Sequence, residues 1–135
     1  MAYFLLIDDE EVFNFIHNQV ITTVHPAARV IEFQSGSEAI DHLRRHASVA
    51  DQLPDFIFVD INMPETTGFE FLERLQNELS ALVRRPNVYM VTSSLFESDR
   101  EKAATYPALT GFLEKPISAD TIRQMIQSLP TANPF

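Results

Sequence analysis

The 135-residue sequence contains no cysteine, which excludes a disulfide framework, a thiolate metal site and a cysteine nucleophile. Any chemistry must therefore use carboxylates, hydroxyls, histidine or lysine. Basic residues are also scarce, because 10 lysines and arginines stand against 19 aspartates and glutamates and the formal net charge is −9. This balance argues against direct binding of nucleic acid, which needs a cationic face. The only lysines are Lys102 and Lys115, so their positions matter.

A long hydrophobic run is missing as well. No apolar segment approaches the roughly 20 residues that a membrane helix needs. The N-terminal segment 1–7 has neither a basic flank nor a small-residue cleavage site, so it indicates a buried strand and not a signal peptide. We expect a cytoplasmic protein with no membrane insertion. The length fits one domain, residues 1–129, with a short tail at 130–135 and no effector domain.

Two kinds of apolar pattern alternate along the chain. Segments with apolar residues at spacings of three and four, typical of amphipathic helices, separate five short β-rich runs. The strands expected from these runs cover residues 3–7, 29–33, 56–59, 88–91 and 111–113. Hydroxyl residues followed by an acid three positions later predict capping boxes at three helix starts, namely Ser35/Glu38, Thr67/Glu70 and Ser98/Glu101. The alternation predicts an α/β fold of five βα units, with helices on both faces of a parallel sheet.

Polar residues stand where four of these strands end. The pair Asp8-Asp9 follows the first strand, Asp60 the third and Thr92 the fourth, and Lys115 comes shortly after the fifth. Ligands of an open parallel sheet bind outside the carboxyl ends of its strands, so we expect these side chains to converge. The convergence would bring together three carboxylates, one hydroxyl and one ammonium.

Crowded carboxylates repel one another, so a divalent cation is implied, and an all-oxygen ligand set suits Mg²⁺. In this interpretation a carboxylate of Asp60 attacks a phosphoryl group, while Thr92 hydrogen-bonds one phosphoryl oxygen and Lys115 pairs with another. An acyl phosphate is labile, so such a site would work as a timed switch.

These residues resemble the receiver domain of two-component response regulators, of the chemotaxis single-domain type. The resemblance covers nearly the whole chain and rests on the acidic pair at 8–9, the run DINMPETTG at 60–68, Thr92-Ser93 and Lys115-Pro116, in that order. It implies a flavodoxin-like, doubly wound (βα)5 fold with strand order 2-1-3-4-5. It also implies a cis bond between Lys115 and Pro116.

The resemblance further assigns roles to residues. Asp60 would be the phosphoacceptor, and the Mg²⁺ ligands would be Asp9 and Asp60 directly, Asp8 largely through water, and Asn62 through its backbone carbonyl. Thr92 and Lys115 would hold the phosphoryl group. Phe112, three residues before the lysine, would rotate inward as the Thr92 hydroxyl moves, so that these two residues form the switch.

The partners implied are a sensor histidine kinase or histidine phosphotransfer protein and an unidentified downstream protein. The chain would then be no enzyme beyond its own phosphorylation and slow dephosphorylation, whose rate Asn62 and Ser94 would tune. Segment 106–110, Tyr-Pro-Ala-Leu-Thr, departs from the short glycine-containing turn common in the family, which predicts an unusual output face. The basic stretch at 84–86 has no functional explanation in the sequence.

The sequence also bears on three other functions. A haloacid-dehalogenase-type phosphatase would want an acid two residues after the nucleophile, where Asn62 stands, and a cap domain for which 135 residues leave no room. A flavodoxin-type flavin carrier would want a phosphate loop after the first strand, where acidic residues 8–11 would repel the phosphate. A pseudo-receiver, which binds a partner without phosphorylation, stays open.

Two of the histidines, His42 and His46, are spaced to grip a metal, but the arginines between them favour a solvated face. Neither His17 nor His25 has an obvious partner.

Overall fold

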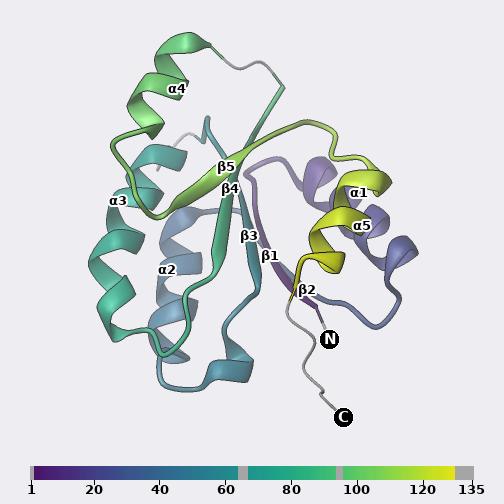
Figure 1. Cartoon of the computed structure of the whole chain (residues 1–135), viewed down its shortest axis with the longest axis horizontal. Coiled ribbons are helices and arrows are strands. Elements are labelled where there is room, and N and C mark those ends of the chain that lie inside the picture. The colour runs from purple at the N-terminus through teal and green to yellow at the C-terminus, as the bar shows by residue number, and fades with distance from the viewer. Residues whose placement is uncertain (1, 64–66, 94–95, 130–135) are drawn as a thin grey trace.

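The structure is a computed structural model that describes residues 2–63, 67–93 and 96–129. Five strands alternate with five helices (Figure 1). The strands are β1 (Tyr3–Ile7), β2 (Arg29–Phe33), β3 (Phe56–Asp60), β4 (Asn87–Thr92) and β5 (Leu109–Glu114). The helices are α1 (Glu11–Val24), α2 (Gly36–Arg45), α3 (Gly68–Glu78), α4 (Glu97–Ala103) and α5 (Ala119–Gln127), with short 3-10 turns at Ala50–Gln52 and Leu79–Ala81.

All strand pairs are parallel and the order is β2-β1-β3-β4-β5, which confirms the predicted doubly wound, flavodoxin-like α/β fold. Figure 1 shows α1 and α5 on one face of the sheet and α2, α3 and α4 on the other. The central strands β1 and β3 are buried along their whole length, as strands covered on both faces must be. The carboxyl ends of the strands therefore share one edge of the sheet.

The core has two halves because successive side chains of a strand point to opposite faces. Leu5 and Ile57 pack toward α2 and α3, whereas Phe4 and Phe56 pack toward α1 and α5. The last two rings stack with centroids 5.1 Å apart. The two apolar layers hold the strand ends, and with them the polar residues, in fixed positions.

Strand β5 begins two residues earlier than the sequence pattern predicts. Leu109 pairs with Val88, and Gly111 pairs with the next residue of β4, so the register shifts at Thr110. The Thr110 hydroxyl accepts the backbone N–H of Val88 at 3.1 Å. Segment 106–110, which departs from the family's short turn, thus ends in a bulge at the edge strand, where the Thr110 side chain bonds the neighbouring strand, and the unusual output face stays a prediction.

The helix starts confirm one of the three predicted capping boxes in full and a second in part. Thr67 and Glu70 form a complete capping box, and the Ser35 hydroxyl accepts the N–H of Glu38 at 3.2 Å. The third prediction is wrong, because α4 begins after Phe96 and places Ser98 inside the helix. There the Asp99 carboxylate accepts the N–H of Phe96 at 3.3 Å, so a cap formed by the acid alone replaces the predicted hydroxyl cap.

Arg84, in the basic stretch without a functional explanation, has a structural role. Its guanidinium donates to the carbonyls of Ala50 and Leu53, and it pairs with the Asp55 carboxylate at 2.8 Å. Asp55 in turn accepts the N–H of Tyr3 at 2.9 Å. Arg84 therefore fixes the loop that leads into β3 and ties it to the start of β1.

Gly68, the first residue of α3, packs against the end of β3. A Cβ at this position would lie 2.7 Å from the backbone oxygen of Asp60 and 3.0 Å from the Cα of Ile61, and neither backbone atom can swing away. We expect Gly68→Ala to lower the free energy of unfolding by about 1–3 kcal/mol, because α3 must move away from β3. Urea unfolding measures this, with Gly111→Ala as control, since a Cβ there meets only ordinary contacts at 3.5 Å. Equal stability of the Gly68 variant and the wild type would contradict this prediction.

Candidate functional site

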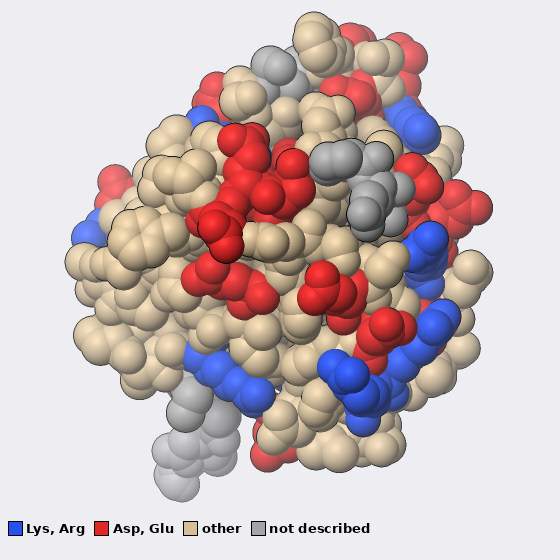
Figure 2. Space-filling view, turned by 180° about the vertical axis from the view of Figure 1, so that it is seen from behind, with Lys and Arg blue, Asp and Glu red and all other residues tan. Residues whose placement is uncertain are grey.

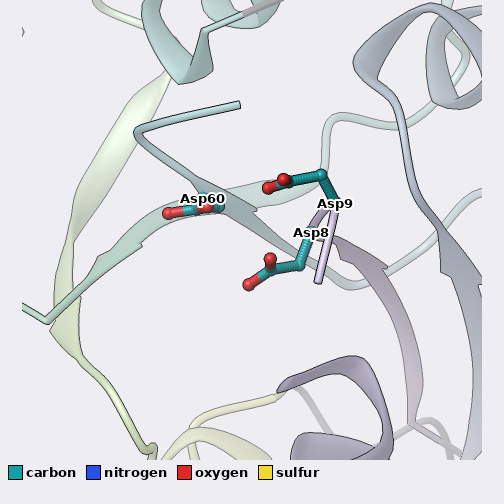
Figure 3. Close-up of side chains that lie close together, drawn as sticks. All are labelled: Asp8, Asp9 and Asp60. Atoms are coloured by element: carbon teal, nitrogen blue, oxygen red, sulfur yellow. The ribbon is translucent and has the colours of Figure 1, made fainter. Parts of the chain in front are cut away.

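Three carboxylates meet at the carboxyl edge of the sheet (Figure 3). Asp8 and Asp9 follow β1, and Asp60 is the last residue of β3. Each offers one oxygen such that all three oxygens lie within 4.8 Å of one another. The sequence expectation that these side chains converge is met, because adjacent parallel strands bring their ends together.

Lys115, directly after β5, reaches across to this cluster. Its ammonium lies 2.7 Å from Oδ2 of Asp8 and 3.4 Å from Oδ1 of Asp60. The side chains of Lys115, Asp8 and Asp60 are only 5%, 6% and 7% exposed. The ammonium also lies 4.2 Å from the centre of the Phe13 ring, a cation–π contact from α1. One positive charge therefore faces three negative ones in a largely dehydrated site.

Asp60 shows the electrostatic consequence. Burial raises the pKa of its carboxyl above the ordinary value, and the neighbouring charge of Asp8 raises it further. Lys115 and the N–H of Asn62, which donates to Oδ1 at 3.4 Å, oppose this rise in pKa. Excess negative charge thus favours protonation of Asp60 until a further cation enters.

Asp9 gives a direct test of whether a cation fits. Its Oδ1 is buried, and no residue that the structure describes hydrogen-bonds to it. A buried polar atom without a partner is costly, and a divalent cation would satisfy it. The available ligands are carboxylate oxygens, which suit a hard ion such as Mg²⁺. The residues present therefore fit the ion.

The surroundings of the cluster are acidic. Figure 2 shows aspartate and glutamate side chains gathered in the upper half of one face, with lysine and arginine mostly toward its lower and right edges. A hollow beside α1 and the end of β2 is lined in part by Glu11, Glu32 and Glu38. This negative potential attracts cations toward the site.

The remaining predicted residues lie around the carboxylates. Thr92 ends β4, is buried, and accepts the N–H of Lys115 on its backbone oxygen at 2.9 Å. It also lines a hollow together with Arg100, Phe112 and Glu114. Phe112 is half-buried and packs against the core on the side of α2 and α3. Its switching role and that of Thr92 stay predictions, as does the ligand role of the Asn62 carbonyl.

Ser94, expected to tune dephosphorylation, lies outside the described residues, as do 64–66 of the family motif. The tail at 130–135 is likewise outside them. The predicted cis bond between Lys115 and Pro116 is confirmed.

Two residues of α1 that sequence reasoning missed support the site. Asn14 is buried and donates to the backbone oxygens of Asp8 and Phe33, each at 3.1 Å, which ties the ends of β1 and β2 together. His17 is 4% exposed, and its Nε2 accepts the backbone N–H of Ile117 at 3.2 Å. The signal in the sequence was faint: two polar residues lie within the apolar pattern of a helix.

His42 and His46, which are spaced to grip a metal, each have a hydrogen-bond partner within the protein. His42 is buried, contrary to the solvated face expected for it, and its Nε2 hydrogen-bonds the Tyr3 hydroxyl at 3.0 Å. His46 Nδ1 bonds the backbone oxygen of His42 at 2.7 Å. Both rings therefore have structural partners.

A pH dependence of stability follows from His17. Burial, and secondarily the charge of Lys115, lowers its pKa from 6.5 to about 4, while Asp8 opposes this shift. Between these two values the unfolded chain binds a proton that the folded chain does not, so stability falls as pH drops from 6.5 toward 4. The expected loss is about 3 kcal/mol at most.

His17→Gln, which does not titrate, should lose correspondingly less stability over the same pH range. Urea unfolding of both proteins at several pH values measures the difference. The lowered pKa of His42 acts in the same direction in both proteins and cancels in the comparison. Parallel pH profiles of the two proteins would contradict the assignment to His17.

No helix within the described residues is long and apolar enough to cross a membrane.

Among proteins of known role, the chain is 31% identical over 98 residues to the polar-differentiation response regulator DivK of Brucella ovis, covering 73% of this chain and 72% of DivK. It is 26% identical over 123 residues to the sensory transduction protein LytT of Enterococcus faecalis, covering 91% of this chain. The match spans only 46% of LytT, so the chain corresponds to about half of that relative.

A solved response regulator receiver protein from Dyadobacter fermentans superimposes with a TM-score of 0.80 at 30% identity, covering 94% of this chain and 96% of that one. The family model described as the response regulator receiver domain matches residues 4–127. This match includes the three carboxylates of the cluster and Lys115. The chain belongs to the response regulator receiver domain family and so to two-component signalling.

Proposed function

We propose that Asp60 accepts a phosphoryl group in a Mg²⁺-dependent reaction, from a histidine kinase or a histidine phosphotransfer protein in the cytoplasm. The observation that carries the proposal is the cluster of Asp8, Asp9 and Asp60, with the Lys115 ammonium beside Asp8 and Asp60. A structural ion pair would need one carboxylate for the lysine. Three carboxylates, one of them with an oxygen that has no partner among the described residues, suit a site that takes up both a cation and an anion.

The transfer is a nucleophilic displacement at phosphorus. Oδ1 of Asp60 pairs with the Lys115 ammonium and accepts a hydrogen bond from the N–H of Asn62. Oδ2 is therefore the oxygen that would attack the phosphoryl group. The bond from Oδ2 to phosphorus forms as the bond from phosphorus to the donor's imidazole nitrogen breaks, and the electron pair stays on that nitrogen. Asp8, Asp9 and Asp60, with the Asn62 carbonyl by family resemblance, would hold Mg²⁺, which neutralises charge on the phosphoryl oxygens when bound.

Lys115 changes partners in this proposal. Its ammonium already lies between Asp8 and Asp60, so a short movement would pair it with a phosphoryl oxygen on Asp60. The Thr92 hydroxyl would take another oxygen, and the hollow that Thr92 shares with Phe112 offers space for the ring to rearrange. Phosphorylation would thereby alter the face made by α4 and β5, which a downstream protein would bind. The chain would catalyse only its own phosphorylation and slow dephosphorylation.

Intact mass spectrometry after incubation with acetyl phosphate tests the proposal, with and without Mg²⁺. We expect a gain of one phosphoryl group that requires Mg²⁺ and is absent in Asp60→Asn. Asp51→Asn, which changes an exposed carboxylate in the turn Ala50–Gln52, is the matched control and should be phosphorylated like the wild type. No gain in the folded wild type would reject phosphoryl acceptance and favour a pseudo-receiver that binds its partner unmodified.

A further inference from the structure

The inner side of α1 contacts the loop that carries Lys115 at two points. Phe13 and His17 are four residues apart and therefore lie on the same side of the helix, with ring centroids 6.1 Å apart. The Phe13 ring lies 4.2 Å from the Lys115 ammonium. His17 accepts the backbone N–H of Ile117 at 3.2 Å. One helix thus touches both the side chain of the lysine and the backbone two residues beyond it.

The backbone of this loop is held by few hydrogen bonds. On the strand side, the N–H of Lys115 donates to the oxygen of Thr92 at 2.9 Å. The next residue, Pro116, has no N–H to donate. The first backbone donor after the lysine is therefore that of Ile117, and His17 is its acceptor. The two bonds bracket Lys115 from either side.

The hydrogen bond between His17 and Ile117 lies in the protein interior. His17 and Ile117 are 4% and 3% exposed, so water cannot readily replace the imidazole as acceptor. An apolar side chain would suit this core position between α1 and the sheet, where Phe58 and Val91 line the same small cavity as His17. A buried imidazole that accepts a backbone N–H from the lysine loop therefore needs an explanation other than packing. Accepting through Nε2 places the proton of the neutral ring on Nδ1.

We propose that His17 is a positioning residue for phosphoryl transfer. By holding the N–H of Ile117, it fixes the loop so that the Lys115 ammonium lies over Phe13 and between the carboxylates. His17 does not touch the phosphoryl group and acts through Lys115. The inference rests on the proposed function, because the step that it supports is phosphorylation of Asp60.

Two substitutions separate this role from simple packing. His17→Leu introduces an apolar side chain of similar size and removes the hydrogen-bond acceptor. His17→Gln places an amide oxygen, which can accept the same N–H, near the position of Nε2. Ile21→Val, one turn further along α1 at a fully buried core position, is the matched control for a mild packing defect. All are compared as folded proteins, at temperatures where circular dichroism shows each to be native.

The readout is the phosphorylation rate at varied acetyl phosphate concentrations in excess Mg²⁺. We expect His17→Leu to lower the maximal rate constant about tenfold, because a displaced ammonium no longer meets the phosphoryl oxygen. His17→Gln should recover most of that loss, and Ile21→Val should keep the wild-type rate. Wild-type rates in His17→Leu, or equal losses in the Leu and Gln variants, would overturn the proposal.

A second measurement keeps the proposal testable if His17→Leu does not fold. An N–H···N bond transmits a scalar coupling between its two nitrogens, so ¹⁵N NMR of the wild type should show one between Ile117 N and His17 Nε2. Its absence would overturn the proposal. The coupling does not require phosphorylation, so failure of the proposed function, seen as no phosphoryl gain in the wild type, is distinguishable from failure of this inference.

Discussion

Lys115→Met is expected to lower the free energy of unfolding by about 3–5 kcal/mol at neutral pH without Mg²⁺. The substitution keeps an unbranched apolar side chain but removes the only ammonium within 4 Å of Asp8 and Asp60 among the described residues. Both carboxylates are buried, so they would be left facing each other without a compensating charge. Removing one member of a buried ionic cluster costs far more than removing a surface charge.

Mg²⁺ should recover part of the stability lost in Lys115→Met, because a cation bound by the same carboxylates replaces the missing charge. Lowering the pH should also reduce the difference in stability between Lys115→Met and the wild type. Lys115 lowers the pKa of Asp60, so its removal raises that pKa further, and the difference from the wild type narrows as Asp60 becomes protonated. Urea unfolding with and without Mg²⁺, at neutral pH and near pH 5, measures both effects.

The chain's other lysine supplies the control. Lys102 is exposed, and its ammonium lies 4.6 Å from the centre of the Phe69 ring. Lys102→Met should cost less than about 1 kcal/mol and should not respond to Mg²⁺ differently from the wild type. If the two methionine variants lost similar stability, the electrostatic account of the site would be wrong.

The site could be predicted as far as sheet geometry alone determines it. Asp8, Asp60 and Thr92 stand at or directly after the ends of neighbouring parallel strands, and such ends lie side by side whatever the helices do. Lys115 belongs to the same set because β5 is the next strand along. Alternating apolar runs were therefore enough to place these residues at one edge of a parallel sheet, whereas the strand order that makes the strands neighbours was implied by the family resemblance.

The contributions of α1 could not be predicted in the same way. His17 and Ile117 are 100 positions apart, and their hydrogen bond depends on how α1 packs beside α5 and the loop before it. Helical periodicity shows that His17 lies on the inner side of the helix, but not which backbone donor it meets. The same holds for the start of α4, where the Asp99 carboxylate caps the helix in place of the predicted Ser98/Glu101 box.

Asp9→Asn is expected to change stability and Mg²⁺ binding in opposite directions. Without Mg²⁺, the variant should be more stable than the wild type by about 1–2 kcal/mol, because one of three carboxylates within 4.8 Å loses its charge. The new amide can donate to the neighbouring carboxylate oxygens, whereas Oδ1 of Asp9 has no partner among the described residues. The affinity of the variant for Mg²⁺ should fall about a hundredfold, because a charged ligand becomes neutral, and at saturating Mg²⁺ this loss outweighs a gain of about 1–2 kcal/mol.

The order of stability should therefore reverse when enough Mg²⁺ is added, because Mg²⁺ stabilises the wild type more than a variant that binds it more weakly. Urea unfolding across a Mg²⁺ titration measures the crossing, and calorimetric titration measures the affinity directly. Glu10→Gln is the control, since this exposed neighbour lies outside the cluster and should leave the Mg²⁺ response unchanged. A variant less stable than the wild type without Mg²⁺ would mean that the Asp9 carboxylate has a stabilising partner in the protein itself. Its charge would then serve the fold and not the binding of a cation.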